Sequence, residues 1–365
     1  MSQSNLAQSD LDSNGDGVWG TVVAVQANFY RVKLESEAEK FLLCTRRTRL
    51  KKIGQRVMVG DRVLVVEPDW VDARGAIARV QPRTTELQRP RVANAKMILL
   101  VFALEEPTLD PWQLSRFLVK AESTVLNLCL CLNKCDLITT TQQQQWQQRL
   151  NQWGYQPSYI SVRQRLGIDE LQQRLEGNIT VVAGPSGVGK SSLIDLLIPS
   201  AKLRVGKVSG KLQRGRHTTR HIELFELPGG GLLADSPGFN QPDLDCMPGS
   251  LAQYFPEARS RLESQSCQFS NCLHRDEPNC VVRGDWERYE HYLDFLEKAV
   301  AKQEVLQQQP DAESSVKLKV ERDGKSQYLP KLKTKKYRRT SRRTKHQNLQ
   351  DLYDKQLEEE DRDSI

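Results

Sequence analysis

The pattern of apolar and polar residues changes character near residue 90. Before that point, short segments with alternating apolar residues are separated by turn-prone positions at Ala27-Asn28, Lys52–Gly54 and Asp72–Gly75. These segments read VWGTVVAVQ, FYRVKLE, KFLLCT, DRVLVVE and AIARV. About five short strands within roughly 65 residues predict a small closed β-barrel of OB-like size.

From about residue 92, longer apolar runs alternate with helical patterns. The runs MILLVFAL (97–104), TVLNLCLCLN (124–133), NITVVAG (178–184) and GLLADSPG (231–238) are typical of buried strands. Helices are expected over Pro111–Glu122 and Thr141–Trp153, and the second places Trp146, Leu150 and Trp153 on one face, which we interpret as packing. This alternation predicts a parallel sheet covered by helices.

Composition limits the class of protein. The chain has 365 residues, enough for two or three domains, with 38% hydrophobic and 27% charged residues. Its longest apolar run, Met97–Leu104, is far shorter than the roughly 20 residues that span a bilayer, and the polar N-terminus carries no signal-peptide pattern. We expect a cytoplasmic protein without membrane contact and, because no heptad repeat is sustained, a monomer.

Charge is distributed unevenly, although the net charge is only +7. Residues 331–345 hold nine Lys or Arg and no acid, whereas residues 351–365 hold seven acids and two bases. Such blocks are typical of a solvated, poorly ordered tail, and the alternative is a basic arm that neutralises nucleic-acid phosphates. The segment Arg46–Lys52, with five basic residues in seven, likewise indicates either an oligonucleotide-binding loop or a solvated one.

A phosphate-binding motif follows the third apolar run. The stretch GPSGVGKS matches G-x-x-x-x-G-K-[ST] and lies between a predicted strand and a predicted helix, the context that such a P-loop requires. Backbone N–H groups of the loop would surround phosphate oxygens, Lys190 would reach the β- and γ-phosphates, and Ser191 would ligate Mg²⁺. The candidate GTP ligands here are Gly184, Pro185, Ser186, Gly187, Val188, Gly189, Lys190, Ser191 and Ser192.

A guanine-specificity motif ends the second apolar run. Asn133-Lys134-Cys135-Asp136 matches N-K-x-D, in which the carboxylate of Asp136 accepts hydrogen bonds from guanine N1–H and N2–H₂ that adenine cannot donate. Ser161 falls where a short loop would cover the base, although its match is loose. The predicted nucleotide is therefore GTP or GDP.

Two switch motifs complete the expected site. Asp235-Ser236-Pro237-Gly238 matches D-x-x-G, so that Asp235 would hold Mg²⁺ through water and Gly238 would sense the γ-phosphate. Upstream, Thr218 and Thr219 are the two candidates for the switch threonine, and the sequence leaves open which of them ligates Mg²⁺.

The order of these motifs is permuted, because N-K-x-D precedes the P-loop. The motifs can still meet if old termini are joined and the chain is cut elsewhere, here just after D-x-x-G. We therefore hypothesise that nucleotide state is transmitted to the following segment. Phe239 stands where Ras-like enzymes carry a water-orienting glutamine, so intrinsic hydrolysis should be slow. His217 is the nearest polar substitute, with a structural or partner-contact role as the alternative.

A metal-ligand pattern follows the switches. Three cysteines and one histidine lie within 14 residues, in the spacing C-x₄-C-x-H-x₅-C. This donor set suits one closed, tetrahedral and structural Zn²⁺ site in a segment without a large core. The expected ligands are Cys267, Cys272, His274 and Cys280.

Over roughly residues 18–300, the chain resembles the family of ribosome small subunit-dependent GTPase A (RsgA/YjeQ). The resemblance rests on a combination of features: the permuted motif order, the barrel, the metal pattern and the stretches GPSGVGKSSL, GRHTTR and DSPGF. The resemblance implies GTP hydrolysis stimulated by the small ribosomal subunit, a role in late maturation of that subunit and binding to its rRNA. It also implies that His217 is the catalytic residue. The tail beyond about residue 310 departs from the family core.

The expected fold is multidomain, with an N-terminal OB-like β-barrel, a central circularly permuted α/β P-loop GTPase domain and a C-terminal, mainly helical zinc-binding domain. The expected segments are a disordered leader (1–17), the barrel (18–83), the GTPase domain (84–245), the zinc-binding domain (246–310) and the tail (311–365). Two alternatives remain: a GTP-gated nucleic-acid-binding regulator that does not act on ribosomes, and a P-loop ATPase or kinase with a chance N-K-x-D.

Overall fold

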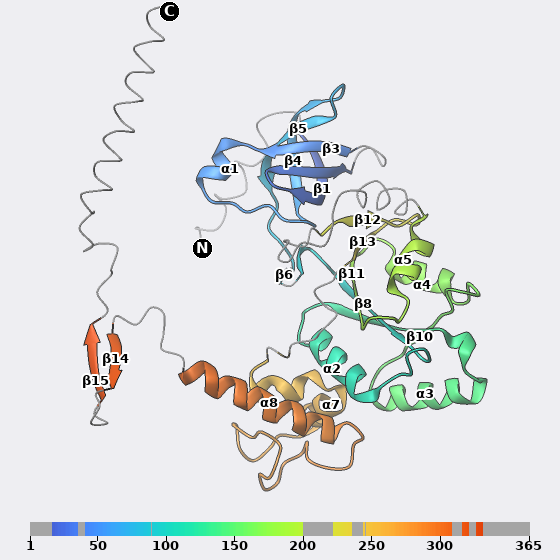
Figure 1. Ribbon diagram of the computed structural model, residues 1–365, viewed down its shortest axis with the longest axis vertical. Coiled ribbons are helices and arrows are strands. Elements are labelled where there is room, and N and C mark those ends of the chain that lie inside the picture. The colour runs from blue at the N-terminus through green and yellow to red at the C-terminus, as the bar shows by residue number, and fades with distance from the viewer. Residues whose placement is uncertain are drawn as a thin grey trace, which may run out of the picture. The chain divides into compact units, whose positions relative to one another are not determined.

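The N-terminal part of the chain folds into the predicted closed barrel (Figure 1). The computed structural model describes residues 17–35, 41–88, 90–199, 222–235, 244, 246–308, 316–320 and 326–330. Barrel strands follow one another in the order β1-β2-β3-β5-β4, and β4 pairs back onto β1. Their bounds are β1 (Val18–Gln26), β2 (Phe29–Leu34), β3 (Phe41–Arg46), β4 (Arg62–Asp69) and β5 (Arg74–Val80).

One element of the barrel differs from the expectation. The basic segment Arg46–Lys52, expected as a loop, contains the short helix α1 (Thr48–Lys52). It has no Gly or Pro to break a helical turn, and Leu50 anchors it because its side chain is buried in the barrel core. The basic side chains of Arg49, Lys51 and Lys52 are consequently left exposed.

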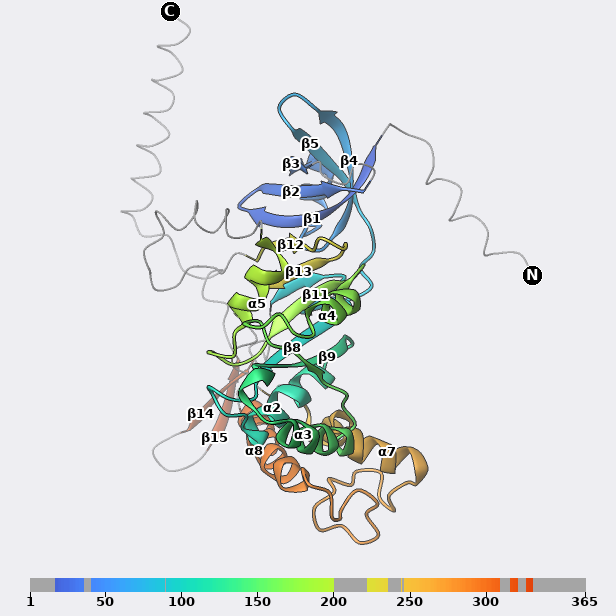
Figure 2. The ribbon, with the colours of Figure 1, turned by 90° about the vertical axis from the view of Figure 1, so that its right-hand side faces the viewer.

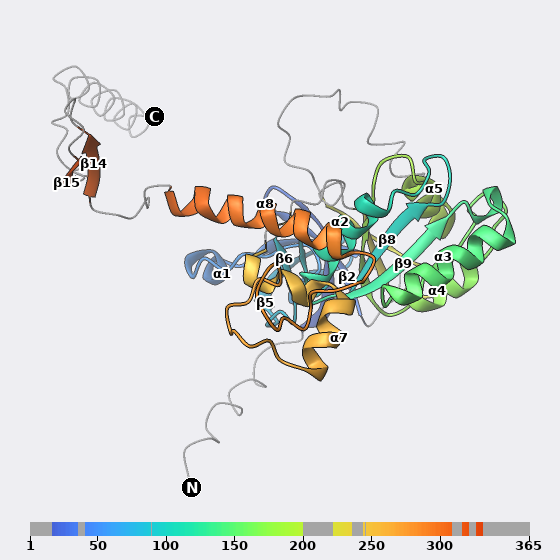
Figure 3. The same ribbon diagram turned by 90° about the horizontal axis from the view of Figure 1, so that it is seen from below.

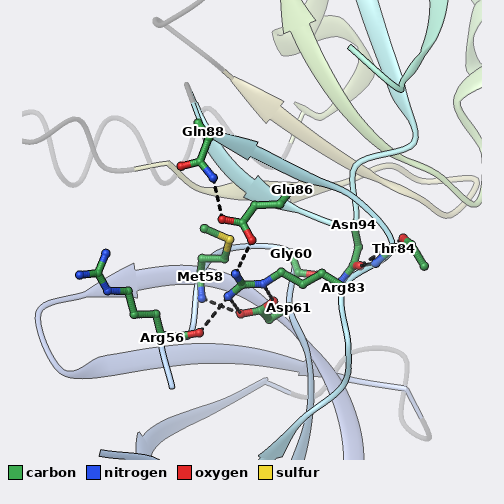
Figure 4. A network of polar contacts seen from close by, with 9 residues as sticks. All are labelled: Arg56, Met58, Gly60, Asp61, Arg83, Thr84, Glu86, Gln88 and Asn94. Atoms are coloured by element: carbon green, nitrogen blue, oxygen red, sulfur yellow. Dashed lines mark hydrogen bonds and ion pairs between the residues drawn. The ribbon is translucent and has the colours of Figure 1, made fainter. Parts of the chain in front are cut away.

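A buried ion pair fixes the chain where it leaves the barrel (Figure 4). Asp61 is fully buried, and its two carboxylate oxygens accept hydrogen bonds from Nε (2.7 Å) and Nη2 (3.0 Å) of Arg83. Arg83 also contacts Glu86, and the backbone N–H of Met58 donates to Asp61. A buried carboxylate needs such partners, so the segment between β5 and the next hairpin is held firmly. That hairpin comprises β6 (Glu86–Gln88) and β7 (Arg91–Ala93).

The central part is a six-stranded sheet in the order β10-β9-β8-β11-β13-β12 (Figures 1 and 2). All neighbours are parallel except β12, which runs antiparallel to β13. The bounds are β8 (Met97–Ala103), β9 (Asn127–Asn133), β10 (Ser158–Tyr159), β11 (Ile179–Ala183), β12 (Leu224–Glu226) and β13 (Leu232–Asp235). Strand β8 is almost fully buried, as a run of seven apolar residues in the middle of a parallel sheet should be.

Helices cover both faces of this sheet. One core joins Ile98 and Leu100 of β8 to Phe117 of α2 and Leu150 of α3, whereas the opposite core joins Leu99 to α4 and α5. Each core takes alternate residues of β8, as strand geometry requires. The helices are α2 (Pro111–Glu122), α3 (Thr140–Gln152), α4 (Ile168–Leu175) and α5 (Lys190–Leu197), with a 3₁₀ turn η1 (Cys135–Leu137) after β9.

The segment after the sheet is mainly helical and packs on α2 (Figure 3). Its elements are η3 (Pro248–Tyr254), α7 (Pro256–Ser264) and α8 (Tyr289–Gln308), and an irregular segment joins α7 to α8. Phe255, Tyr292 and Phe295 form its core together with Val119 of α2. We call residues 246–300 the C-terminal module.

Residues beyond Val300 belong to a second compact unit. This unit contains an antiparallel pair, β14 (Val316–Val320) and β15 (Ser326–Pro330), within the segment 311–365 that was assigned to the tail and before its basic block at 331–345. The alternating pattern VKLKV favours a strand. Within the described ranges, no helix is both long enough and apolar enough to cross a membrane.

Candidate functional site

The carboxyl ends of the parallel strands bring the sequence motifs to one edge of the sheet. The P-loop follows β11, Asn133 ends β9, Ser161 follows β10 and Asp235 ends β13. These strands are neighbours through β8, so motifs that are permuted along the chain become adjacent in space. Ligands of open α/β sheets bind at this edge.

Two positions of the P-loop require glycine, because atoms of neighbouring strands lie too close to leave room for a Cβ. Gly184 has φ +137°, and a Cβ there would lie 2.1 Å from the carbonyl oxygen of Val101. Gly189 has φ +94°, and a Cβ there would lie 2.4 Å from Nδ2 of Asn133. Only glycine fits at these positions, so the loop can wrap closely against β8 and β9 and present its N–H groups at the start of α5.

Asn133 ties the P-loop to the loop after β10. Its buried side chain donates from Nδ2 to the carbonyl of Val188 (2.9 Å) and accepts at Oδ1 from the N–H of Val162 (3.3 Å). Ser161 is fully buried, and its Oγ accepts from the N–H of Gln164 (3.0 Å). The guanine-reading motif, the P-loop and the expected base-covering loop are therefore connected through one amide.

Both lysines of the motifs are held at this edge. Lys134 has a left-handed backbone (φ +59°), and its Nζ donates to the carbonyls of Glu106 and, at 3.4 Å, of Gly187. Lys190 donates from Nζ to the carbonyls of Gly184 (2.9 Å) and Pro185. Lys134 thus connects the loop after β8 to the P-loop, and Lys190 connects the start of α5 to the first residues of that loop.

A cavity of about 340 Å³ lies between these motifs. Its lining includes several predicted GTP ligands and four residues that were not predicted, Glu106, Leu137, Val162 and Arg163. The signal for Glu106 was its place directly after a buried strand, at the edge where the other motifs were already expected. The lining residues are Glu106, Asn133, Lys134, Asp136, Leu137, Val162, Arg163, Gly189 and Ser192.

Part of the predicted site falls outside the described residues. These positions include His217, Thr218, Thr219, Gly238 and Phe239. Asp235 is described as the last residue of β13, which places its backbone at the carboxyl edge beside the P-loop strand. The expected roles of these residues therefore stay predictions.

The three cysteines and the histidine of the C-terminal module converge. Their potential ligand atoms all lie within 4.8 Å of one another, and the group comprises Cys267, Cys272, His274 and Cys280. Nδ1 of His274 lies 3.3 Å from Sγ of Cys280 and 3.6 Å from Sγ of Cys267. The two sulfurs are 4.0 Å apart, close to the roughly 3.8 Å edge of a tetrahedron with metal–sulfur bonds of about 2.3 Å. This cluster can hold one metal ion.

Burial shifts the pKa values of two residues in this cluster, His274 and Cys272. It lowers the pKa of His274, which favours the neutral imidazole that a metal ligand must be. It raises the pKa of Cys272 to about 12, which disfavours a bare thiolate there. A metal ion stabilises thiolates directly, so a bound metal would offset the cost that burial places on the Cys272 thiolate.

Comparison with known proteins agrees with this geometry. The family model of the RsgA GTPase matches residues 80–245. A protein of Trichormus variabilis named "Small ribosomal subunit biogenesis GTPase RsgA" is 63% identical over 356 residues, covering 92% of this chain and 96% of that protein. An Arabidopsis thaliana protein named "Small ribosomal subunit biogenesis GTPase RsgA 1, mitochondrial" is 41% identical, covering 94% and 88%.

Solved structures show the same architecture. YjeQ from Thermotoga maritima has a TM-score of 0.65 at 30% identity, covering 78% of this chain and 99% of that one. YloQ, described as a circularly permuted GTPase, has a TM-score of 0.65 at 29% identity, covering 79% and 96%.

Fold and site together define a P-loop GTPase with a circularly permuted core, an OB-like barrel and a C-terminal helical module that can bind a metal. The chain belongs to the RsgA GTPase family and is a GTP hydrolase. The predicted fold class and family are thereby confirmed.

Proposed function

We propose that the chain hydrolyses GTP in response to the small ribosomal subunit and acts as a late-stage maturation factor of that subunit. The observation that carries the proposal is the match over nearly the whole chain to a protein named for small ribosomal subunit biogenesis, combined with the P-loop and N-K-x-D motifs that meet at one edge of the sheet. The curated names favour this function over a GTP-gated regulator that acts elsewhere.

In the proposed site, Asp136 reads guanine from the cavity between β9 and the loop after β10. Ser161 shapes the loop that covers the base, and Asn133 and Lys134 brace that cavity against the P-loop. The backbone N–H groups of residues 186–192 bind the phosphates at the start of α5, where the helix dipole favours negative charge. Lys190 places its ammonium against the β- and γ-phosphates.

Hydrolysis in this proposal requires positioning rather than covalent chemistry. Ser191, Asp235 and Thr218 or Thr219 would hold Mg²⁺, which neutralises charge on the β- and γ-phosphates when bound. Phe239 offers no hydrogen bond to the attacking water, so His217 takes that orienting role when the switch segment is placed by the ribosomal partner. The free enzyme is then slow and the engaged enzyme fast.

Contacts with rRNA are assigned to exposed basic and aromatic residues of the barrel. Arg49, Lys51 and Lys52 of α1 are exposed and can neutralise phosphates. Trp70, in the turn between β4 and β5, is 49% exposed and offers a face for base stacking. The basic block at residues 331–345 would add phosphate contacts.

The metal of the C-terminal module is proposed to be Zn²⁺. Three thiolates and one imidazole supply four protein ligands, which leaves no open position for a reacting water. The bound metal would therefore stabilise the irregular segment between α7 and α8 without taking part in hydrolysis, through its ligands Cys267, Cys272, His274 and Cys280. In this proposal, the folded C-terminal module provides a surface that the ribosomal partner contacts.

The proposed organisation keeps the barrel at 18–83, the GTPase domain at 84–245, the zinc-binding domain at 246–310 and leader and tail outside them. We propose a monomer that acts in the cytoplasm, because the substrate particle is assembled there. No membrane association is part of this proposal.

Co-sedimentation tests the choice of partner. The full chain with a non-hydrolysable GTP analogue should pellet with purified small subunits, much less so with GDP, and should stay in the supernatant with large subunits. Replacing Lys51 and Lys52 of α1 by Glu should weaken pelleting and flatten its salt dependence, whereas Glu263→Gln in α7 is a matched surface control. Equal pelleting with both subunits would contradict the proposal.

A further inference from the structure

One ligand of the metal cluster lies in an unusual backbone conformation. His274 has φ +58°, in the left-handed region that non-glycine residues seldom adopt. The conformation aims Nδ1 at the sulfurs of Cys280 (3.3 Å) and Cys267 (3.6 Å). A strained residue of this kind persists only where its surroundings determine it, so the neighbours of His274 are informative.

Glu277 binds the backbone on both sides of the ligand His274. Its Oε1 accepts a hydrogen bond from the backbone N–H of Leu273 (2.7 Å), and its Oε2 accepts one from the N–H of Arg275 (2.8 Å). These N–H groups belong to the residues immediately before and after His274. One carboxylate therefore fixes the peptide groups on both sides of the ligand, through bonds that are strong because the acceptor is charged.

Two tyrosines of α8 hold the carbonyls of the same turn. The hydroxyl of Tyr289 donates to the carbonyl of His274 (2.9 Å), and that of Tyr292 donates to the carbonyl of Leu273 (2.8 Å). Tyr292 is fully buried in the core of the C-terminal module. The turn is thus held by its N–H groups from Glu277 and by its carbonyls from α8.

We propose that Glu277 is a positioning residue for the metal centre, which fixes the Leu273–Arg275 turn so that Nδ1 of His274 faces the cysteine sulfurs before the metal arrives. This inference rests on the metal-binding role proposed above for the cluster. Glu277 offers no atom to the cluster itself, and it acts by removing the cost of ordering His274 on metal binding. Its loss should lower metal affinity without removing a ligand.

Cobalt and zinc titrations of the full chain test the assignment. Metal-free protein is titrated with Co²⁺, followed by its thiolate charge-transfer and d–d absorption, and Zn²⁺ affinity is then measured by competition with a chromophoric chelator. Glu277→Gln keeps the side-chain size but replaces one acceptor by an amide donor, and should lose about 10- to 100-fold in Zn²⁺ affinity with altered d–d bands.

The matched control is Asp276→Asn, which removes the same charge from the adjacent exposed residue, whose carboxylate makes no hydrogen bond to the described part of the chain. It should bind Zn²⁺ as the wild type does. Tyr292→Phe, which removes only the hydroxyl from the turn, should give a smaller loss than Glu277→Gln. GDP affinity, measured in every variant, reports that the GTPase core remains folded.

Distinct results separate this inference from the metal site itself. If the wild type binds Co²⁺ tightly and Glu277→Gln matches Asp276→Asn in affinity and spectrum, the positioning role is wrong while the metal site stands. If the wild type takes up no Co²⁺, the metal site and the positioning role both fall.

Discussion

Arg288 and Trp153 join the C-terminal module to the GTPase core, with the Arg288 guanidinium 4.7 Å from the centre of a Trp153 ring. Arg288 is fully buried, forms an ion pair with Glu257 of α7 and donates from Nη2 to the carbonyl of Trp153 (3.5 Å). Trp153 is the C-cap residue of α3, the helix that follows the N-K-x-D motif. The module is therefore attached to the guanine-reading half of the sheet.

Removal of Arg288 should destabilise this attachment strongly. Arg288→Ala would leave the nearly buried carboxylate of Glu257 without its partner, a change that typically costs about 3–5 kcal/mol. Arg288→Met, which retains packing against Trp153, should cost less. Urea denaturation followed by tryptophan fluorescence measures the difference. Lys298→Ala, which breaks an exposed pair with Asp294 on α8, is the control and should change the free energy of unfolding by about 0.5 kcal/mol or less.

A buried histidine at the same interface should make the attachment sensitive to acid. Nδ1 of His291 lies 2.7 Å from Oγ of Ser115 on α2, and both residues are buried. Burial, with a smaller contribution from Arg288, lowers the pKa of His291 from its ordinary 6.5 to about 4. Between these values the unfolded chain binds a proton that the folded chain does not, so stability is present above pH 6.5 and is lost as the pH falls toward 4.

His291→Gln removes this titration while keeping a polar partner for Ser115. Denaturation midpoints measured at pH 7, 6 and 5 should fall less steeply in the variant than in the wild type. A parallel fall in the two proteins would show that His291 does not set the acid sensitivity.

The apolar pattern was sufficient to predict the layers of the fold. The run Met97–Leu104 became the buried strand β8, and the stripe Trp146, Leu150 and Trp153 packs into the core that covers one face of the sheet, as predicted. Periodicity is informative here because each helix buries one face. It could not reveal the partner of Arg288, which lies 31 residues away in Glu257 and depends on tertiary packing.

The candidate site was likewise predictable where a motif carries its own chemistry. Each of three motifs consists of residue types that bind a particular ligand: N-K-x-D binds guanine, the P-loop binds phosphates and the cysteine–histidine pattern binds a metal ion. The bridging role of Asn133 could not be read from spacing, because its two partners, Val188 and Val162, lie far from it in the chain. Glu277 was missed for a different reason: its partners, Leu273 and Arg275, are near it in the chain, but a carboxylate that binds backbone N–H groups of an irregular turn has no fixed sequence spacing.

Nucleotide choice should depend on Asp136. Asp136→Asn replaces the carboxylate that accepts from guanine N1–H and N2–H₂ with an amide that matches xanthine better. Affinity for GDP should fall and affinity for XDP should rise, as measured by displacement of a fluorescent nucleotide. Asp169→Asn, on exposed α4 surface, is the control. If Asp136→Asn kept the wild-type guanine preference, Asp136 would not be the residue that reads the base.

Hydrolysis should depend on His217 separately from binding. His217→Ala removes the group proposed to orient water, so subunit-stimulated turnover should be abolished while GTP affinity stays nearly unchanged. His217→Gln, which can still hydrogen-bond water, should retain part of the stimulation. If His217→Ala turns over normally, the histidine has a structural or partner-contact role instead.

The most direct test of the proposed function is single-turnover GTP hydrolysis by the full chain with purified ribosomal components. Small subunits should accelerate hydrolysis well above the slow rate of the free enzyme, whereas large subunits and free rRNA should leave it unchanged. Equal acceleration by free rRNA, or none by small subunits, would contradict a small-subunit-dependent GTPase and favour a nucleic-acid-binding regulator gated by GTP.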